Sequence, residues 1–210
     1  MASFKYVRTV KPGHAFRDWL IYVLGDRIRN KDCKVRVFKL SHASHMVCRY
    51  EFKGEKLSII AKFFAVPTGM IKKYDSYAQM KKEYKYLKVA EELIDIPKPI
   101  AANKNFCCVL LTEYVSGKSL LWYFDHGKDH EIKLELVAEM LRKLHESTQT
   151  YYDKESEFSK FNSVLKHLKI NRHEKKKYEP LLKKWQYSSL LDREKGCMIH
   201  NDCTPVNFIF

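Results

Sequence analysis

The spacing of hydrophobic positions predicts a sheet-rich first half and a helical second half. Apolar side chains recur at helical spacing near the N-terminus and then fall into short runs of strand length, separated by polar turns. After the Ser116-Gly117 break they return to helical spacing. The elements expected before this break are a helix at residues 14–29, strands at 35–40, 46–52 and 57–64, a helix at 77–93, an extended segment at 100–102 and a strand at 107–114. The helices expected after it span residues 132–145, 158–168 and 174–185.

This order of elements predicts an α+β fold with two lobes. Residues 1–115 are expected to form a small lobe with an antiparallel sheet and an N-terminal helix, and residues 116–210 a mainly helical lobe. Ser116-Gly117 is the expected hinge between them. No apolar run approaches the ~20 residues that span a bilayer, and the first residues lack the apolar core of a secretory signal. No membrane span is therefore expected.

The net charge of +14 lies mostly in the first lobe, where 22 Lys and Arg face 11 Asp and Glu. A basic surface favours an anionic partner, such as nucleotide phosphates, nucleic acid or a membrane surface. A solvated, lysine-rich surface explains the charge equally well. The six cysteines contain no CxxC pair, which favours a reduced, cytoplasmic protein over a disulfide framework.

The strongest chemical motif is the segment from His200 to Asn207, which reads His-x-Asp-x4-Asn between two short apolar runs. Phosphoryl transfer needs an acidic residue that orients the hydroxyl nucleophile and accepts its proton, and it needs oxygen ligands for a metal–phosphate complex. Asp202 and Asn207, five positions apart on one loop, can supply both. The alternative is a polar surface loop that matches by chance.

This loop resembles the catalytic loop of the aminoglycoside phosphotransferase and choline kinase family, which shares the protein-kinase-like fold. The family's loop reads His-Gly-Asp with an Asn at the same offset, and here Asn201 replaces the Gly. The resemblance implies that Asp202 is the catalytic base and that Asn207 is a Mg²⁺ ligand. It implies a structural role within the loop for His200.

Further segments match the family in the same order, so the resemblance spans about residues 35–210. Lys62, in an apolar run, matches the strand lysine that binds the nucleotide phosphates. An isolated lysine in an apolar strand is unfavourable unless it is paired or lies at an edge. Glu83 matches the helix glutamate that pairs with this lysine, although an exposed helix charge is the alternative. We therefore expect an ion pair between Lys62 and Glu83.

Residues 111–117 resemble the family's hinge strand. The resemblance implies that the backbone of Glu113 and Val115 binds the adenine edge, with the Thr112 side chain behind it. We expect an inner strand here whose backbone groups at Glu113 and Val115 are left unpaired by neighbouring strands, since adenine needs one acceptor and one donor at fixed spacing.

The expected phosphate loop, residues 41–45, departs from the family because it contains no glycine. Ser41 and Ser44 are small enough to let backbone N–H groups approach a phosphate. His42 and His45 could add further donors.

Two Cys and two His between residues 33 and 48 offer another interpretation, a zinc site. Closed zinc sites usually use tighter Cys pairs, and a strand–turn–strand would make these side chains diverge. Zinc is therefore the weaker interpretation for Cys33, His42, His45 and Cys48.

The sequence ends at Phe210. In the family a second metal ligand, an Asp, follows the Asn after a dozen to twenty residues, and a helical region beyond it shapes the acceptor pocket. Neither is present here. We therefore expect the 210-residue chain to be incomplete for catalysis, either as part of a longer sequence or through natural truncation.

The leading functional interpretation is a kinase that uses ATP and Mg²⁺ to phosphorylate a hydroxyl group of a small molecule. The Asp202 loop lacks the Arg of the protein-kinase His-Arg-Asp motif, so an atypical, RIO-type protein kinase is the alternative enzyme. A different class is a non-catalytic pseudokinase or fragment that binds an acidic partner through the basic first lobe. Phosphate transfer distinguishes the enzymes from the binding module.

Overall fold

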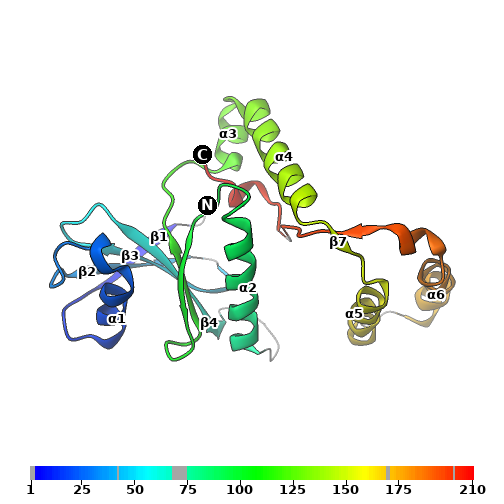
Figure 1. Cartoon of the computed structure of the whole chain (residues 1–210), viewed down its shortest axis with the longest axis horizontal. Helices are drawn as coiled ribbons and strands as arrows, with labels where there is room; N and C mark the ends of the chain where they lie inside the picture. Colours follow the sequence, from blue (N-terminus) through cyan, green and yellow to red (C-terminus); the bar gives the residue numbers. More distant parts are fainter. Residues whose placement is uncertain (1–2, 42, 68–74, 169–170, 201) are drawn as a thin grey trace. The chain divides into compact units, whose positions relative to one another are not determined.

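The computed structural model describes residues 3–41, 43–67, 75–168, 171–200 and 202–210. The chain divides into two compact units (Figure 1). The first contains residues 1–130 and 205–210, and the second contains residues 131–204. The division into a nucleotide-binding lobe and a helical lobe at residues 115 and 116 remains a prediction.

The first unit is built on a six-stranded antiparallel sheet with the strand order β1-β2-β3-β4-β6-β5. The turn between β3 and β4 contains Gly54, whose φ of 86° suits glycine better than any other residue. The strands are β1 Phe4–Val10, β2 Val35–Leu40, β3 His45–Phe52, β4 Ser58–Pro67, β5 Pro99–Asn103 and β6 Val109–Glu113. The strands expected from the sequence are therefore present, and β1 is an addition.

One face of the sheet packs against helix α1, Ala15–Leu24. Alternate residues of each strand point to this face, as the two-residue period of a strand requires. Phe16 and Leu20 of α1 pack among the buried side chains that the strands contribute. These are Val35, Val37, Cys48, Tyr50, Phe52, Ile59, Ala61, Phe63, Val109 and Leu111.

The opposite face carries helix α2, Ser76–Ala90. Phe64 of β4 and Leu110 of β6 are buried here against Met80 of the helix. The Asp75 side chain caps the helix by accepting hydrogen bonds from the amides of Tyr77 and Ala78, both at 3.0 Å. The sheet is thus covered by a helix on each face, and α2 covers the end of its face that includes β4, β5 and β6.

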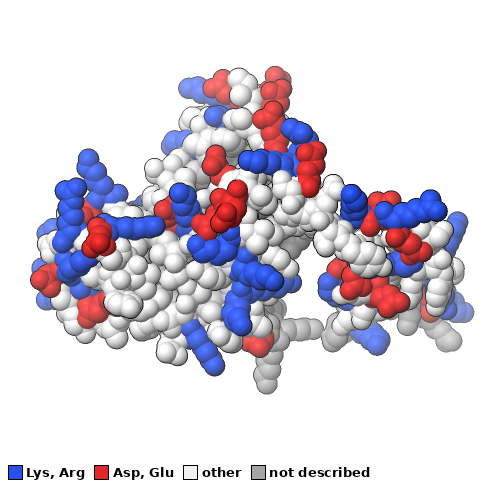
Figure 2. All heavy atoms as spheres, in the orientation of Figure 1, with Lys and Arg blue, Asp and Glu red and all other residues white. Residues whose placement is uncertain are grey.

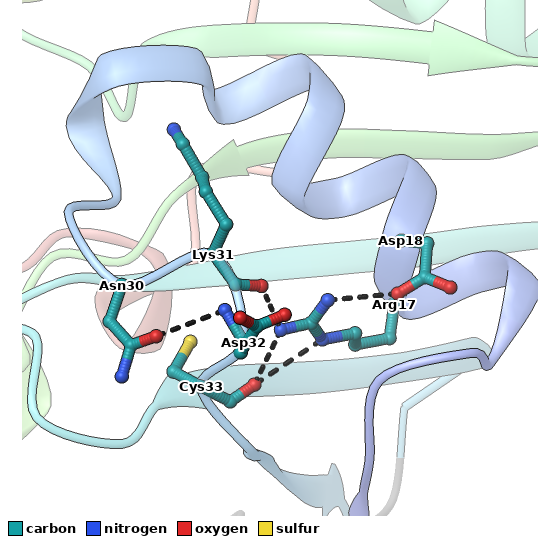
Figure 3. A network of polar contacts seen from close by, with 6 residues as sticks. All are labelled: Arg17, Asp18, Asn30, Lys31, Asp32 and Cys33. Carbon is teal, nitrogen blue, oxygen red and sulfur yellow. Dashed lines mark hydrogen bonds and ion pairs between the residues drawn. The ribbon is translucent and has the colours of Figure 1, made fainter.

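Arg17 of α1 is the only charged residue that is buried in the part of the chain that the structure describes. Figure 3 shows its guanidinium reaching across to the segment that precedes β2. It donates to the Cys33 carbonyl at 2.7 Å, to the Lys31 carbonyl, and to the Asp18 carboxylate at 2.8 Å. Arg17 therefore fixes the connection between α1 and the sheet.

The chain leaves β6 through residues 114–119 and enters α3, Leu120–His126. The Ser119 side chain accepts a hydrogen bond from the Trp122 amide at the start of α3, and Gly127 ends the helix with a left-handed conformation. The end of the chain returns to this segment, shown in red beside α3 in Figure 1. Lys118 and Phe210 exchange two backbone hydrogen bonds of 2.9 Å, and the Leu120 amide donates to the Phe208 carbonyl at 2.8 Å.

The second unit is mainly helical. It holds most of helix α4, His130–Ser147, followed by α5, Lys154–His167, and α6, Arg172–Gln186. Two short strands, β7 at Thr150–Tyr151 and β8 at Lys195–Gly196, pair antiparallel. The 3-10 helices of the chain are η1 Gly25–Arg27, η2 Ser189–Arg193 and η3 Pro205–Asn207. None of the described helices is long and apolar enough to cross a membrane.

Several predicted boundaries were wrong. Helix α1 ends at Leu24 rather than residue 29, because Gly25 adopts a φ of 51° that interrupts the helix. Strand β6 begins at Val109 rather than at residue 107, because Cys107 and Cys108 have φ values of 55° and 52°. Such left-handed residues do not continue a strand. Helix α3 was not expected.

We predict that Arg17→Met lowers the free energy of unfolding by about 2–3 kcal/mol, because it leaves the Cys33 and Lys31 carbonyls without their buried donor. Urea unfolding monitored by tryptophan fluorescence measures this. Arg27→Met is the matched control, since Arg27 makes only a longer ion pair of 3.6 Å at the surface. Equal effects of the two substitutions would contradict the role assigned to Arg17.

Candidate functional site

Lys62 of β4 and Glu83 of α2 form an ion pair, which confirms the pairing expected from the sequence. The Lys62 Nζ donates to both carboxylate oxygens of Glu83, at 2.9 and 2.7 Å. Each side chain keeps 30% of its surface exposed. The Lys62 Nζ also lies 4.7 Å from the centroid of the Phe64 ring. The amine is therefore held in place and still accessible from one side.

The alternation of β4 explains why Lys62 points toward α2. Ala61 and Phe63 fill the core on the α1 face, so Lys62 and its neighbours two positions away point to the other face. Phe64 packs with α2 there. The capping of α2 by Asp75 fixes where the helix begins, and Glu83 follows two turns later on the side that meets β4.

His45, at the start of β3, lies on the same side of the sheet as Lys62, and Ser44 precedes it. The His45 ring packs at 5.4 Å against Phe64, and its Nδ1 lies 3.1 Å from the Ser44 hydroxyl. Burial lowers the pKa of His45, and the nearby Lys62 charge lowers it further, while Glu83 opposes them. Histidine is therefore expected to be neutral here at pH 7.

Ser41 is engaged elsewhere. Its hydroxyl accepts a hydrogen bond from the Ser3 amide at 3.1 Å and donates to the Ser3 carbonyl at 3.2 Å. This side chain is thus used to join β2 to the N-terminal segment, and the phosphate-binding role expected for Ser41 remains a prediction. His42 lies outside the described residues.

The side chains considered for zinc diverge. Cys33 and Cys48 are buried in the core on the α1 face, whereas His45 packs against Phe64 on the other face. Burial raises the pKa of both thiols. Over the described ranges, no group of three or more His, Cys, Asp or Glu could hold a metal ion. All six cysteines of the chain are free thiols.

Strand β6, which holds the expected hinge residues, is an inner strand between β4 and β5, as expected. Thr112 stands opposite Ile60, two positions from Lys62, and therefore shares the face of Lys62. The expectation of an unpaired backbone was wrong for the Glu113 amide, which donates to the Lys98 carbonyl at 3.0 Å. The Val115 backbone has no hydrogen-bond partner among the described residues, and this residue is 45% exposed.

Asp202 and Asn207, the residues expected in a catalytic loop, are both exposed. Asp202 belongs to the second unit, and Asn207, in η3, belongs to the first. Asn207 is followed by the buried Phe208, whose carbonyl is bonded to the start of α3. The His200 carbonyl lies 3.2 Å from the Cys203 thiol, which donates to it. Asn201 lies outside the described residues.

Lysine side chains are concentrated over α2, where Figure 2 shows them as a blue band. One of them, Lys88, is paired with Glu91 at 2.6 Å, and this hydrogen bond raises the pKa of Lys88. The exposed lysines of this helix are Lys81, Lys82, Lys85 and Lys88. Solvation and local pairing explain such a surface, and the anionic partner suggested by the net charge remains a prediction.

Sequence reasoning missed how tightly the hinge is packed at Gly117. A Cβ atom placed there would lie 2.4 Å from the Phe210 carbonyl oxygen and 2.7 Å from the Ile209 Cγ2. The sequence showed only a break at Ser116-Gly117, because the residues that approach it lie more than ninety positions away.

We predict that Gly117→Ala destabilises the first unit by about 1–3 kcal/mol, because the added methyl group collides with backbone that cannot move aside cheaply. Urea unfolding is the measurement. Gly196→Ala serves as the control, since its Cβ would meet its nearest neighbour at an ordinary 3.5 Å. An equal loss of stability in both variants would show that the Gly117–Phe210 approach has no special role.

Comparisons with known proteins agree with the resemblance noted in the sequence. The sequence profile of the phosphotransferase enzyme family, APH, matches residues 49–210. Neither the curated proteins nor the solved structures gave a significant match. The match begins in β3 and includes Lys62, Glu83, strand β6 and residues 200–207, where the catalytic loop is expected. The fold is accordingly an α+β fold of the kinase-like type with a sheet lobe, and the chain belongs to the phosphotransferase enzyme family.

Proposed function

We propose that the protein is an ATP- and Mg²⁺-dependent phosphotransferase that transfers the γ-phosphate of ATP to a hydroxyl group of a small molecule. The observation that carries the proposal is the two-oxygen ion pair between Lys62 and Glu83, in a chain of the phosphotransferase family. The acceptor class is taken from the resemblance of the Asp202 loop to aminoglycoside phosphotransferases.

Lys62 would bind the nucleotide phosphates. A partly buried ammonium group attracts phosphate oxygens more strongly than an exposed one, because the local dielectric constant is lower. Glu83 keeps the flexible lysine chain in one position, so little conformational freedom remains to be lost when a phosphate binds. Ser44, whose hydroxyl lies 3.1 Å from the Nδ1 of His45, would contact the phosphates as well.

Asp202 would act as the general base that orients the acceptor hydroxyl and takes its proton. Asn207 would hold Mg²⁺ through its amide oxygen. This amide oxygen fits the ion, since Mg²⁺ prefers oxygen ligands. The bound ion would supply charge neutralisation at the phosphates. His200 would hold the loop in its working conformation.

The adenine edge would bind along residues 113–115. The Val115 backbone lies beyond the end of β6 and is available as a donor and an acceptor. Because the Glu113 amide is occupied by Lys98, only the Glu113 carbonyl could contribute at that residue. Thr112, on the face of Lys62, would contact the base from behind.

Binding of MgATP tests the nucleotide site. We predict that Lys62→Met weakens binding by at least about tenfold, because the loss of one charge-assisted hydrogen bond is worth about 1.5–3 kcal/mol. Isothermal titration calorimetry measures the affinity. Lys39→Met is the control, since Lys39 is an exposed lysine of the same sheet. Unchanged MgATP affinity in Lys62→Met would show that Lys62 does not bind the nucleotide phosphates.

Transfer tests the chemistry. We predict that the full-length protein phosphorylates at least one member of a panel of aminoglycosides, amino alcohols, sugars and nucleosides with [γ-³²P]ATP. Asp202→Asn should lower the rate by about 10²–10⁴-fold while MgATP affinity stays within a factor of two. Cys203→Ser, one position away, is the control.

The results separate the alternatives. Phosphorylation of protein substrates alone would favour the RIO-type kinase. Binding of MgATP without any transfer would favour the non-catalytic module. Transfer that survives Asp202→Asn would show that another residue is the base.

A further inference from the structure

Arg49 of β3 lies inside a cage of aromatic rings. Its guanidinium carbon is 4.8 Å from the ring centroids of Phe38 and Tyr114, and 5.3 Å from that of Phe4. Only 19% of the arginine side chain is exposed. The three rings come from β1, from β2 and from the residue after β6, so one side chain joins segments that are distant in the sequence.

Few polar groups compete for this guanidinium. Its terminal nitrogen donates to the Glu51 carboxylate on the same strand, and Glu51 also pairs with Arg36 at 2.6 Å. The Arg49 Nε is buried and has no hydrogen-bond partner among the described residues. A cation that is removed from water and lacks a full set of acceptors is held more strongly by the faces of aromatic rings.

The cage stands on the face of the sheet that carries Lys62. Arg49 is opposite Ile60, and Ile60 is opposite Thr112, so these three residues form one row across β3, β4 and β6. Residues that pair directly across strands share a face. Lys62 and Val47 form the adjacent row. The cage therefore borders the place assigned to the nucleotide.

Tyr114 connects the cage to the hinge. It lies between Glu113 and Val115, the two residues proposed to bind the adenine edge. Its amide donates to the Ser58 carbonyl at a long 3.3 Å, and its ring meets Phe4 edge-on at 6.2 Å as well as Arg49. Since the Val115 backbone has no partner among the described residues, its direction depends on how Tyr114 is anchored.

We propose that Arg49 is a positioning residue for nucleobase binding. It acts by anchoring the Tyr114 ring, which forms the aromatic cage together with Phe4 and Phe38. The inference rests on the proposed function, because it assumes that the base binds at the hinge. It goes beyond that function by assigning base affinity to a residue that touches neither the base nor the phosphates, and by making β1 part of the nucleotide site through Phe4.

Two probes separate this role from a general structural one. Adenosine carries the base without phosphates, and inorganic tripolyphosphate carries phosphates without the base. We predict that Arg49→Met weakens adenosine binding about tenfold, a loss typical of a desolvated cation–π contact. Tripolyphosphate affinity should stay within a factor of two, because Lys62 is untouched. Calorimetry with the full chain measures both.

Arg36→Met is the matched control. Arg36 also contacts the Phe38 ring and the Glu51 carboxylate, but the described contacts do not join it to Tyr114. The Arg36→Met substitution should leave the affinities for adenosine and for tripolyphosphate unchanged. Tyr114→Phe keeps the ring and should retain adenosine affinity, whereas Tyr114→Leu removes the ring and should lose it. Tyr114→Leu also provides the test if Arg49→Met does not fold.

Three outcomes decide the matter. Selective loss of adenosine binding in Arg49→Met or Tyr114→Leu supports the inference. Unchanged affinities, or equal losses for both probes, overturn it while the proposed function stands. If the wild-type chain binds neither adenosine nor tripolyphosphate, the proposed function fails first, and the inference fails with it.

Discussion

A lysine in the middle of an apolar strand is the constraint on which this structure depends. Lys62 lies between residues that fill the core, and a partly buried ammonium group in that place is unfavourable unless it is paired. Glu83 supplies its partner, and it can do so only if α2 packs on the Lys62 face of the sheet. The position of α2, its cap at Asp75 and the burial of Phe64 all serve this arrangement. A structural requirement and a candidate phosphate site are thus met by the same pair.

The two faces of the sheet in the first unit differ in how they are covered. Helix α1 and its buried partners form the main core on one face, and the Arg17 hydrogen bonds hold that helix to the segment before β2. The other face is closed by α2 at one end and by the Arg49 cage at the other. Ile60, Val47 and Thr112 lie between them and are only partly buried. A half-covered apolar surface flanked by cations suits a ligand that has a flat base and charged phosphates.

The sequence predicted the parts of this arrangement that depend on local pattern. The alternation in β2 and β3 and the helical spacing in α2 and α4 are visible in single segments, and the order of Lys62, Glu83 and the catalytic loop carried the family resemblance. Strand β1 was missed because five of its seven residues are exposed, so it shows no alternating apolar face. β1 forms because it pairs with β2, and its own sequence pattern does not indicate this pairing. The left-handed Cys107 and Cys108 were missed because cysteine gives no sign of that conformation.

The hinge shows why site residues are harder to predict than elements. Gly117, Tyr114 and the Glu113 amide are fixed by Phe210, Arg49 and Lys98 respectively, and each of these partners comes from a different part of the chain. The family resemblance names the backbone groups that are candidates for binding the base, but it does not show what holds them in place. In this protein the hinge is anchored on one side by hydrogen bonds from the end of the chain and on the other by a cation among aromatic rings. The free backbone of Val115 lies between these anchors, so its geometry is set by contacts that no single segment of the sequence contains.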